Sequence, residues 1–256
     1  MTDTDLSIDT GAFIENGFVH LEEAFPRELA DECRAILWRD TGCDPDDPAT
    51  WTQPVVRLGN YAQEPFRAAA NTPRLHAAFD DLVGAGGWLP QGGLGTVPVR
   101  FPSPDEPGDD GWHVEASLPG DDPMNFMTYR TNVSSKGRAL LMLFLFSDVG
   151  EEDAPTRIRV GSHLDVPPIL EPAGDKGMAF MDLAGQAAAA SEERPVAYAA
   201  GRAGDVYLCH PFLVHAAQPH HGTRPRFMAQ PPLLPSGKGP ADDSPVRVAI
   251  RRGLGS

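Results

Sequence analysis

Two histidines and a carboxylate in this sequence have the spacing of a metal site. His113 and Glu115 lie two residues apart, between a Pro/Asp/Gly-rich loop and another turn. If the segment is a strand, side chains at positions i and i+2 project from one face, so both groups can reach one ion. His215 follows later, at the end of an apolar run. Two imidazoles and one carboxylate leave three positions of a metal open, as non-haem Fe(II) sites for a 2-oxo acid and O₂ require.

A second histidine competes for the distal ligand position. His210 precedes His215 by five residues, an offset that places the two side chains on opposite faces of a continuous strand unless Pro211 interrupts it. His215 is the preferred ligand. A lone His-x-acid pair occurs by chance in an acidic chain, so these residues need support from the rest of the sequence.

Arginine after the distal histidine completes the candidate site. Arg226 lies eleven residues beyond His215, where a returning strand can bring its guanidinium back beside the pocket. A guanidinium binds a carboxylate through two parallel hydrogen bonds, which suits the distal end of a 2-oxo acid. Arg224, on the other side of Pro225, shares the same parity, so strand geometry alone does not choose between them. Arg100, upstream of the His-x-Glu pair, can pair with an acidic surface residue or reach the pocket, and the surface pair is the preferred interpretation.

Composition favours an enzyme of small-molecule chemistry. The 256 residues include 21 Lys+Arg and 36 Asp+Glu, a net charge of −15, which disfavours nucleic acid and anionic membrane as partners. The acidic N-terminus has no apolar segment of a signal peptide, and the longest apolar run, Ala139 to Phe146, is shorter than the ~20 residues of a membrane span. Three cysteines without a C-x-x-C pair support neither a disulfide framework nor structural zinc. We expect a cytoplasmic protein.

The elements that must position these residues fall into two regions. Residues 1–92 are expected to form a helical support, with helices from Asp9 or Thr10 to Gly17, from Pro26 to Thr41 and from Pro73 to Val83, and a strand from Phe18 to Leu21. Pro45 to Pro54 is expected to be a loop.

From residue 93 to 235 short apolar runs alternate with Gly, Pro and Asp, which predicts a sandwich, barrel or jelly roll. The expected strands are Gly95 to Phe101, Met127 to Val133, Leu140 to Phe146, Thr156 to Val160, Val196 to Tyr198, Val206 to Cys209 and Phe227 to Leu234. Residues 165–194 are expected to be an insertion with a helix from Ala179 to Glu193, poorly anchored and suited to act as a lid. Residues 236–256 form a C-terminal tail, and the whole chain is expected to be one domain.

Taken together, these motifs resemble the phytanoyl-CoA dioxygenase family of Fe(II)/2-oxoglutarate-dependent oxygenases. The resemblance is carried by F-x-E-N-G-F-V-x-L at Phe13 to Leu21, His113-x-Glu115, Arg159-Val160-Gly161-Ser162-His163, G-D-V-x-L-x-H at Gly204 to His210, and His215 followed by Arg226. They occur in the family's order over nearly the whole chain. The family usually has Asp where this chain has Glu115.

The resemblance implies a mainly β protein with α-helical N-terminal support and a double-stranded β-helix (jelly-roll, cupin-like) core. It implies that His113, Glu115 and His215 bind Fe(II), that Arg226 binds the C5 carboxylate of 2-oxoglutarate, and that Thr128 contributes to the co-substrate site. The expected reaction is hydroxylation of a small molecule by O₂, with release of succinate and CO₂.

Two other functions are compatible with such a pocket. One is a cupin-like metalloenzyme that performs isomerisation or hydrolysis, and the other is a non-catalytic descendant that binds a ligand. Neither would need a 2-oxo acid. The substrate and the oligomeric state are not encoded in any motif of the sequence.

Overall fold

The N-terminal helices form where their capping residues predict. The computed structural model describes residues 7–256, and its first helix, α1 (Thr10–Asn16), begins at Asp9, whose carboxylate accepts a hydrogen bond from the N–H of Ala12. It ends at Gly17, which has a φ of 86°, a left-handed conformation that glycine adopts without steric cost. Helices α2 (Arg27–Thr41) and α4 (Pro73–Val83) also match the sequence-based prediction, with α3 (Glu64–Ala70) between them.

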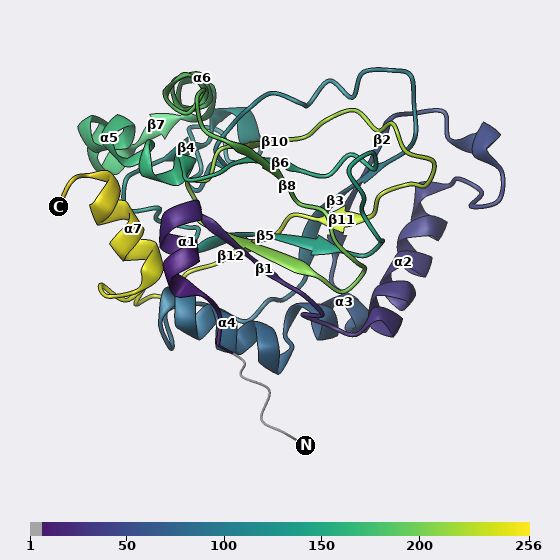
Figure 1. Ribbon diagram of the computed structural model, residues 1–256, viewed down its shortest axis with the longest axis horizontal. Coiled ribbons are helices and arrows are strands. Elements are labelled where there is room, and N and C mark those ends of the chain that lie inside the picture. The colour runs from purple at the N-terminus through teal and green to yellow at the C-terminus, as the bar shows by residue number, and fades with distance from the viewer. Residues whose placement is uncertain (1–6) are drawn as a thin grey trace.

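The major sheet is antiparallel and joins both ends of the chain. Its strands are β1 (Phe18–Leu21), β9 (Val206–Cys209), β5 (Leu140–Leu145) and β11 (Met228–Ala229) in that order, with β12 (Pro232–Leu233) also paired to β5. In Figure 1 this sheet crosses the middle of the molecule, with α3 and α4 below it and α2 at its side. The N-terminal region is therefore more than a helical support, since β1 is an edge strand of the main sheet.

A smaller sheet carries the distal histidine. It consists of β10 (His215–Ala216), β6 (Arg157–Arg159) and β8 (Val196–Tyr198), again antiparallel, and lies above the major sheet in Figure 1. Two further strand pairs flank the site. These are β2 (Val55–Tyr61) with β3 (Leu94–Arg100), and β4 (Arg130–Thr131) with β7 (Met178–Ala179).

The described residues thus form a mixture of helices and antiparallel sheets without a closed barrel, rather than a mainly β protein. Three expected segments also differ. Met127 to Val133 was expected as a strand but contains the end of a 3₁₀ turn (Phe126–Thr128), started by the Asn125 side chain, and the short β4. Phe227 to Leu234 splits into β11 and β12 around Pro231, and the loop from Pro45 to Pro54 includes a 3₁₀ turn (Pro48–Thr50).

The inserted segment is anchored more firmly than the sequence suggests. It contains α5 (Pro167–Leu170), a 3₁₀ turn (Glu171–Lys176), β7 and α6 (Phe180–Ala190), and another 3₁₀ turn (Ser162–Leu164) directly precedes it. Leu170, Leu183 and Ala187 are buried, and Arg194 pairs with Asp165 through two hydrogen bonds of 2.9 and 2.6 Å. The expectation of a poorly anchored segment is wrong, because its helices bury an apolar face and its two ends are joined.

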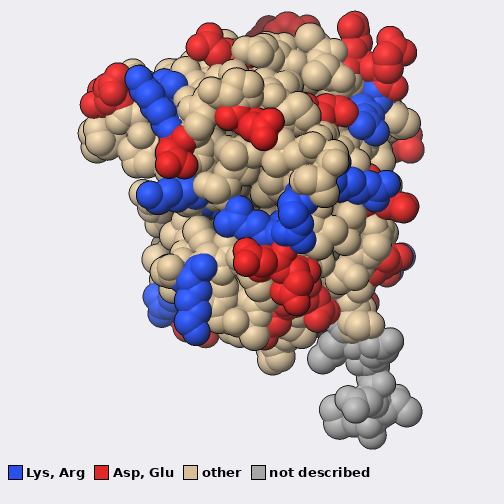
Figure 2. Space-filling model, turned by 90° about the vertical axis from the view of Figure 1, so that its left-hand side faces the viewer, with Lys and Arg blue, Asp and Glu red and all other residues tan. Residues whose placement is uncertain are grey.

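The C-terminal tail also contains structure. Helix α7 (Pro245–Gly253) begins at Ser244 and packs against α1, α4 and α5, with Val246 and Ile250 buried. Seen from that side, Lys and Arg side chains form a band across the molecule between acidic groups (Figure 2), so charge of both signs is exposed on this face. None of the helices in residues 7–256 is long and apolar enough to cross a bilayer.

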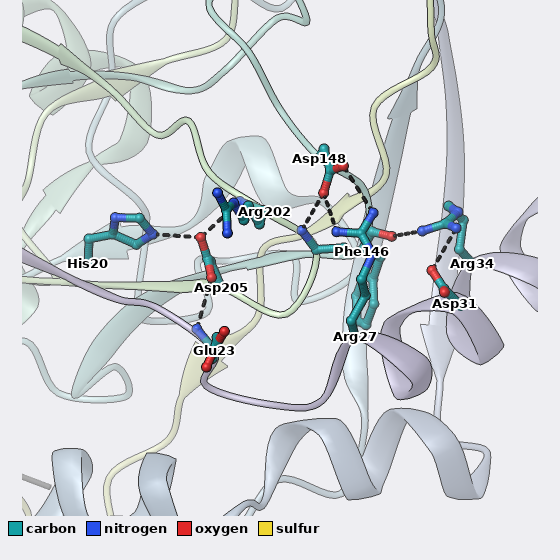
Figure 3. A network of polar contacts seen from close by, with 10 residues as sticks. His20, Glu23, Arg27, Asp31, Arg34, Phe146, Asp148, Arg202 and Asp205 are labelled. Carbon is teal, nitrogen blue, oxygen red and sulfur yellow. Dashed lines mark hydrogen bonds and ion pairs between the residues drawn. The ribbon is translucent and has the colours of Figure 1, made fainter. Parts of the chain in front are cut away.

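A buried carboxylate joins the turns at one end of the major sheet. Asp205, at the start of β9, accepts hydrogen bonds from the N–H groups of Glu23 and Arg202 and lies 3.0 Å from Nε2 of His20 (Figure 3). Beside it, Arg27 binds Asp148 through both ends of its guanidinium. These contacts explain the Gly-Asp pair that precedes β9, because the aspartate holds the β1–α2 turn against the β8–β9 turn.

Candidate metal centre

His113 and His215 face each other across a pair of backbone hydrogen bonds. The N–H of each residue donates to the carbonyl of the other at 3.0 Å, although His113 lies outside any regular strand. Directly opposed residues of an antiparallel pair project side chains to the same face. The two imidazole rings accordingly lie 4.4 Å apart, centroid to centroid.

Both imidazoles are oriented by their own backbone. Nδ1 of His113 lies 2.9 Å from the carbonyl oxygen of Gly111, and Nδ1 of His215 lies 2.9 Å from that of Leu213. A carbonyl only accepts, so each Nδ1 carries the proton and each Nε2 keeps its lone pair. This is the tautomer and the carbonyl contact that metal-binding histidines commonly show.

The carboxylate of Glu115 completes the group. Its Oε1 lies 3.9 Å from Nε2 of His113 and 3.7 Å from Nε2 of His215, and the three potential ligand atoms all lie within 4.8 Å of one another. Two neutral imidazoles and one carboxylate suit a divalent transition metal. The structure therefore brings together the three residues predicted as ligands, and the donor set fits Fe(II).

Buried charge around Glu115 keeps this side chain ionised. Burial alone raises the pKa of Glu115, but the positive charge of Arg138, together with the adjacent His215 and His113, outweighs this effect and lowers the pKa to about 2. Burial also lowers the pKa of His113, and the neighbouring His215 adds to that effect. A charged carboxylate beside a neutral imidazole is the protonation state that metal binding needs.

A second buried arginine accompanies Arg226. Arg100 and Arg226 form a backbone-paired bridge, with N···O distances of 3.0 and 2.8 Å, and their side chains are 3% and 1% exposed. Nη2 of Arg100 binds Asp109 at 2.8 Å, while Arg226 donates to the carbonyls of Ala154 and Pro98. The Nε atoms of both arginines and Nη1 of Arg100 are buried without a partner.

The positive charge of this pair exceeds the negative charge facing it. Burial and the neighbouring Arg100 lower the pKa of Arg226 far below its usual value, against a weaker effect of Asp109. An anion bound here would relieve the repulsion and use the free donors. Arg100 does pair with a carboxylate, as expected, but this carboxylate belongs to Asp109, which lines the cavity together with Arg100. Sequence reasoning allowed Arg100 to reach the pocket but preferred the surface pair, whereas Arg100 lines the cavity.

One cavity of about 580 Å³ joins the two histidines to Arg100. Its polar lining includes Arg57, Thr96, Arg100, Asp109, His113, His215 and Gln230, and its apolar lining includes Trp112, Phe126, Met127, Phe180, Met181 and Ala184. Pro98, whose carbonyl accepts from Arg226, also lines it, so Arg226 lies directly behind the wall. The size is that of a pocket for a small organic ligand.

Neighbouring residues hold the part of the cavity wall around His215 and Trp112 in place. The hydroxyl of Ser162 accepts a hydrogen bond of 2.9 Å from the N–H of Val214, next to the distal histidine. Trp112 is covered by two guanidinium groups, those of Arg157 at 4.8 Å and Arg159 at 4.4 Å from its ring centroid. Cation–π contacts of this kind favour a fixed orientation of the indole beside the cavity.

Other residues considered from the sequence lie elsewhere. His210 is fully buried, its Nε2 contacts the carbonyl of Val246, and it packs against His163 rather than the triad. The hydroxyl of Thr128 donates to the carbonyls of Asp122 and Asn125, and this residue does not line the cavity. The prediction that Thr128 binds the co-substrate therefore has no contact to support it. Arg224 is exposed, unlike Arg226.

Comparison with known proteins agrees with this geometry. Residues 13–228 match the family model described as phytanoyl-CoA dioxygenase (PhyH). No curated protein matches the chain. Among solved structures, the α-ketoglutarate-dependent epimerase SnoN from nogalamycin biosynthesis is 20% identical with a TM-score of 0.56, over 86% of this chain and 79% of its own.

Two further structures are similar. HygX from Streptomyces hygroscopicus, solved with nickel, 2-oxoglutarate and hygromycin B, is 19% identical with a TM-score of 0.51, over 85% of this chain and 82% of its own. EctD from S. alaskensis is 16% identical with a TM-score of 0.55, over 92% and 79%. At these identities the likeness concerns the fold.

Proposed function

Because the chain belongs to the phytanoyl-CoA dioxygenase (PhyH) family, we propose that it is an Fe(II)- and 2-oxoglutarate-dependent oxygenase that hydroxylates a small molecule. The observation that carries the proposal is a single cavity lined by His113, His215 and Arg100, with Glu115 beside both imidazoles and the buried Arg226 behind the wall at Pro98. The core would be the double-stranded β-helix that the sequence motifs imply.

Fe(II) would be held by Nε2 of His113, Nε2 of His215 and Oε1 of Glu115, which already face one another. With three protein ligands, Fe(II) would retain positions for a chelating 2-oxo acid and O₂, and it would supply the oxidising chemistry for hydroxylation of a substrate C–H bond. The Nδ1 hydrogen bonds fix the orientation of both imidazoles, with Nε2 toward the metal position, and Arg138 keeps the carboxylate of Glu115 charged.

The distal carboxylate of 2-oxoglutarate would bind at Arg100 and Arg226. Arg100 lines the cavity with the histidines, and the free donors of both arginines lie in a site that water does not reach. A hydrogen bond to a buried charge is stronger than one in water, so the pair selects for a dianionic co-substrate. Asp109 holds Arg100 in place by its hydrogen bond and offsets part of the positive charge.

Anaerobic spectroscopy tests the proposal. Fe(II) and 2-oxoglutarate added together should give a visible metal-to-ligand absorption band, and the band should be lost in His215→Ala. Arg224→Met, a change of an exposed arginine near Arg226, serves as the control and should retain it. Fe(II) binding without a band would favour a non-redox metalloenzyme, and no Fe(II) binding would favour a ligand-binding protein. Succinate release with candidate metabolites then identifies the substrate.

A further inference from the structure

We propose that the substrate presents an extended apolar face, of fused-ring or acyl type, to a hydrophobic rim at the mouth of the cavity. This rim consists of Phe126, Met127, Phe180, Met181 and Ala184, all of which line the cavity. The inference rests on the proposed function and adds the substrate class, which neither the metal group nor the arginine pair specifies.

The rim begins beside the metal group. The ring of Phe180 lies 5.9 Å from that of His113, edge to face, and 5.0 Å from that of Phe126. Met127 and Met181 follow on the 3₁₀ turn and on α6. An apolar molecule lying along these side chains would therefore have one end at the reactive position of the site.

The rim leaves much apolar surface in water. Phe126, Met127 and Met181 are 43%, 53% and 58% exposed. Each square ångström of apolar surface left in water forgoes roughly 25 cal/mol, so a cluster of large apolar side chains at a cavity mouth indicates a binding surface. Methionine adapts its shape to different apolar partners, which suits contact with a bulky ligand.

The exposure of the rim does not come from loose packing of its elements. Strands β4 and β7 pair directly below it, and the N–H of Phe180 donates to the carbonyl of Tyr129 at 2.9 Å, which joins the two halves of the rim. The opposite face of α6 is buried through Leu183 and Ala187. The rim therefore has a backbone held by hydrogen bonds and an apolar surface that is open to a ligand in the cavity.

The charged groups of the cavity are largely engaged with one another. Asp109 accepts from Arg57 at 2.6 Å and from Arg100 at 2.8 Å, and the arginine pair serves the co-substrate under the proposed function. A sugar or an amino acid would find few ionic partners here and would leave the rim in water. A molecule with a broad apolar face covers it.

Binding of three uncharged probes tests this inference. The full-length protein, loaded anaerobically with Fe(II) and 2-oxoglutarate, would be titrated calorimetrically with 2-naphthol, 1-octanol and methyl α-glucoside. We expect 2-naphthol or 1-octanol to bind at least tenfold more tightly than the glucoside, and the better of the two distinguishes a ring from a chain. Met127→Glu and Met181→Glu should each weaken that binding at least fivefold.

Met124→Glu is the matched control. Met124 is 94% exposed in the same segment but does not line the cavity, so this variant should change probe binding less than twofold. All three variants should keep the absorption band of the Fe(II) and 2-oxoglutarate complex. Equal affinity for the three probes, or an equal loss in Met124→Glu, overturns the inference while the band persists.

Self-association gives a separate outcome. If Met181→Glu converted a dimer to a monomer in sedimentation experiments without affecting probe binding, the rim would be an interface between copies of the chain, and the inference would be wrong. Absence of the band in the unaltered protein counts instead against the proposed function. The two failures are thus distinguished in one set of measurements.

Discussion

Arg138 contacts the side of Glu115 that faces away from the histidines. Its Nη2 lies 3.4 Å from Oε2 of Glu115, whereas Oε1 lies nearest the two imidazoles. Nη2 also lies 3.3 Å from the carbonyl of Ala116, and Arg138 is 8% exposed. The family usually has an aspartate at this position, so a longer ligand here comes with a buried guanidinium that fixes its orientation.

Replacing Arg138 should weaken metal binding. We expect Arg138→Met to lower the affinity for Co(II), a spectroscopic substitute for Fe(II), by about tenfold to a hundredfold, as for other residues that orient a metal ligand. The measurement is a Co(II) titration followed by visible absorption. Lys136→Met, an exposed change two residues away, is the control. Unchanged Co(II) affinity in Arg138→Met would show that Glu115 does not depend on this contact.

Metal affinity and melting temperature should distinguish variants of the three candidate ligands from a variant of His210. His113→Ala, Glu115→Ala and His215→Ala should each abolish turnover and weaken metal binding, because two protein ligands hold a labile divalent ion poorly. His210→Ala should keep metal affinity but lower the melting temperature, since it removes a fully buried side chain bonded to Val246. Loss of Fe(II) binding in His210→Ala, with retention in His215→Ala, would reverse the assignment.

The two arginines that flank Pro225 should differ in their effect on 2-oxoglutarate. Arg226→Met should raise the KM for 2-oxoglutarate at least about a hundredfold, since each tenfold corresponds to about 1.4 kcal/mol and a buried carboxylate would lose a charged partner. Arg224→Met should change it less than about fivefold. Succinate release at fixed substrate measures both. The reverse ranking would move the anchor to Arg224.

Arg100→Met provides an internal comparison for the arginine pair. If both guanidinium groups share one carboxylate, this variant should also raise the KM for 2-oxoglutarate, by at least about tenfold, with metal affinity unchanged. Its control is Arg57→Met, because Arg57 also binds Asp109 but is half exposed at the mouth. An unaltered KM in Arg100→Met would assign Arg100 to packing alone.

Acid should destabilise the fold through a buried histidine. Burial lowers the pKa of His163 to about 4, while its Nε2 contacts the carbonyl of Ile14 in α1. The unfolded state, with a pKa near 6.5, binds a proton more readily, so the contribution of this residue is complete above about pH 6.5 and is lost as the pH falls toward 4. The loss should amount to about 3 kcal/mol.

Urea unfolding between pH 4 and pH 7 measures this dependence. His163→Asn, whose amide can also donate to a carbonyl, should show a weaker pH dependence over the same range, even if the variant is less stable at pH 7. His221→Asn changes an exposed histidine and should leave the dependence as it is. An identical slope in all three proteins would remove His163 from the acid response.

Local signals made much of the fold predictable. Asp9, Thr72, Gly17, Gly42 and Gly84 mark helix ends by hydrogen bonds within a few residues, and the structure has these ends where the sequence predicts them. The strand expected from Met127 is mostly a turn, because Asn125 caps it and the hydroxyl of Thr128 bonds backward to nearby carbonyls. A prediction from hydrophobicity alone does not include such hydrogen bonds between side chains and the backbone.

The site was predictable only where its residues follow a recognisable spacing. His113, Glu115 and His215 were found because their spacing and order resemble those of the phytanoyl-CoA dioxygenase family, although His113 lies outside any regular strand. Arg138 and Arg100 were missed or misassigned, because their importance depends on contacts with residues far away in the sequence, and an arginine in a sequence is usually exposed. The hydrophobic rim likewise arises only when α6 is placed opposite the turn at Phe126.

The pairing of β1 with β9 affects how the protein folds during its synthesis on the ribosome. His20 of β1 pairs with Tyr207 of β9, and its side chain contacts Asp205, which lies 185 residues further along the chain. The first strand to be synthesised must therefore wait until nearly the whole chain has emerged before it finds its partner, and contacts of such long range form slowly. Until then Val19 and Leu21 remain exposed on an unpaired strand, a state that attracts chaperones. Expression at reduced temperature should accordingly raise the yield of folded protein.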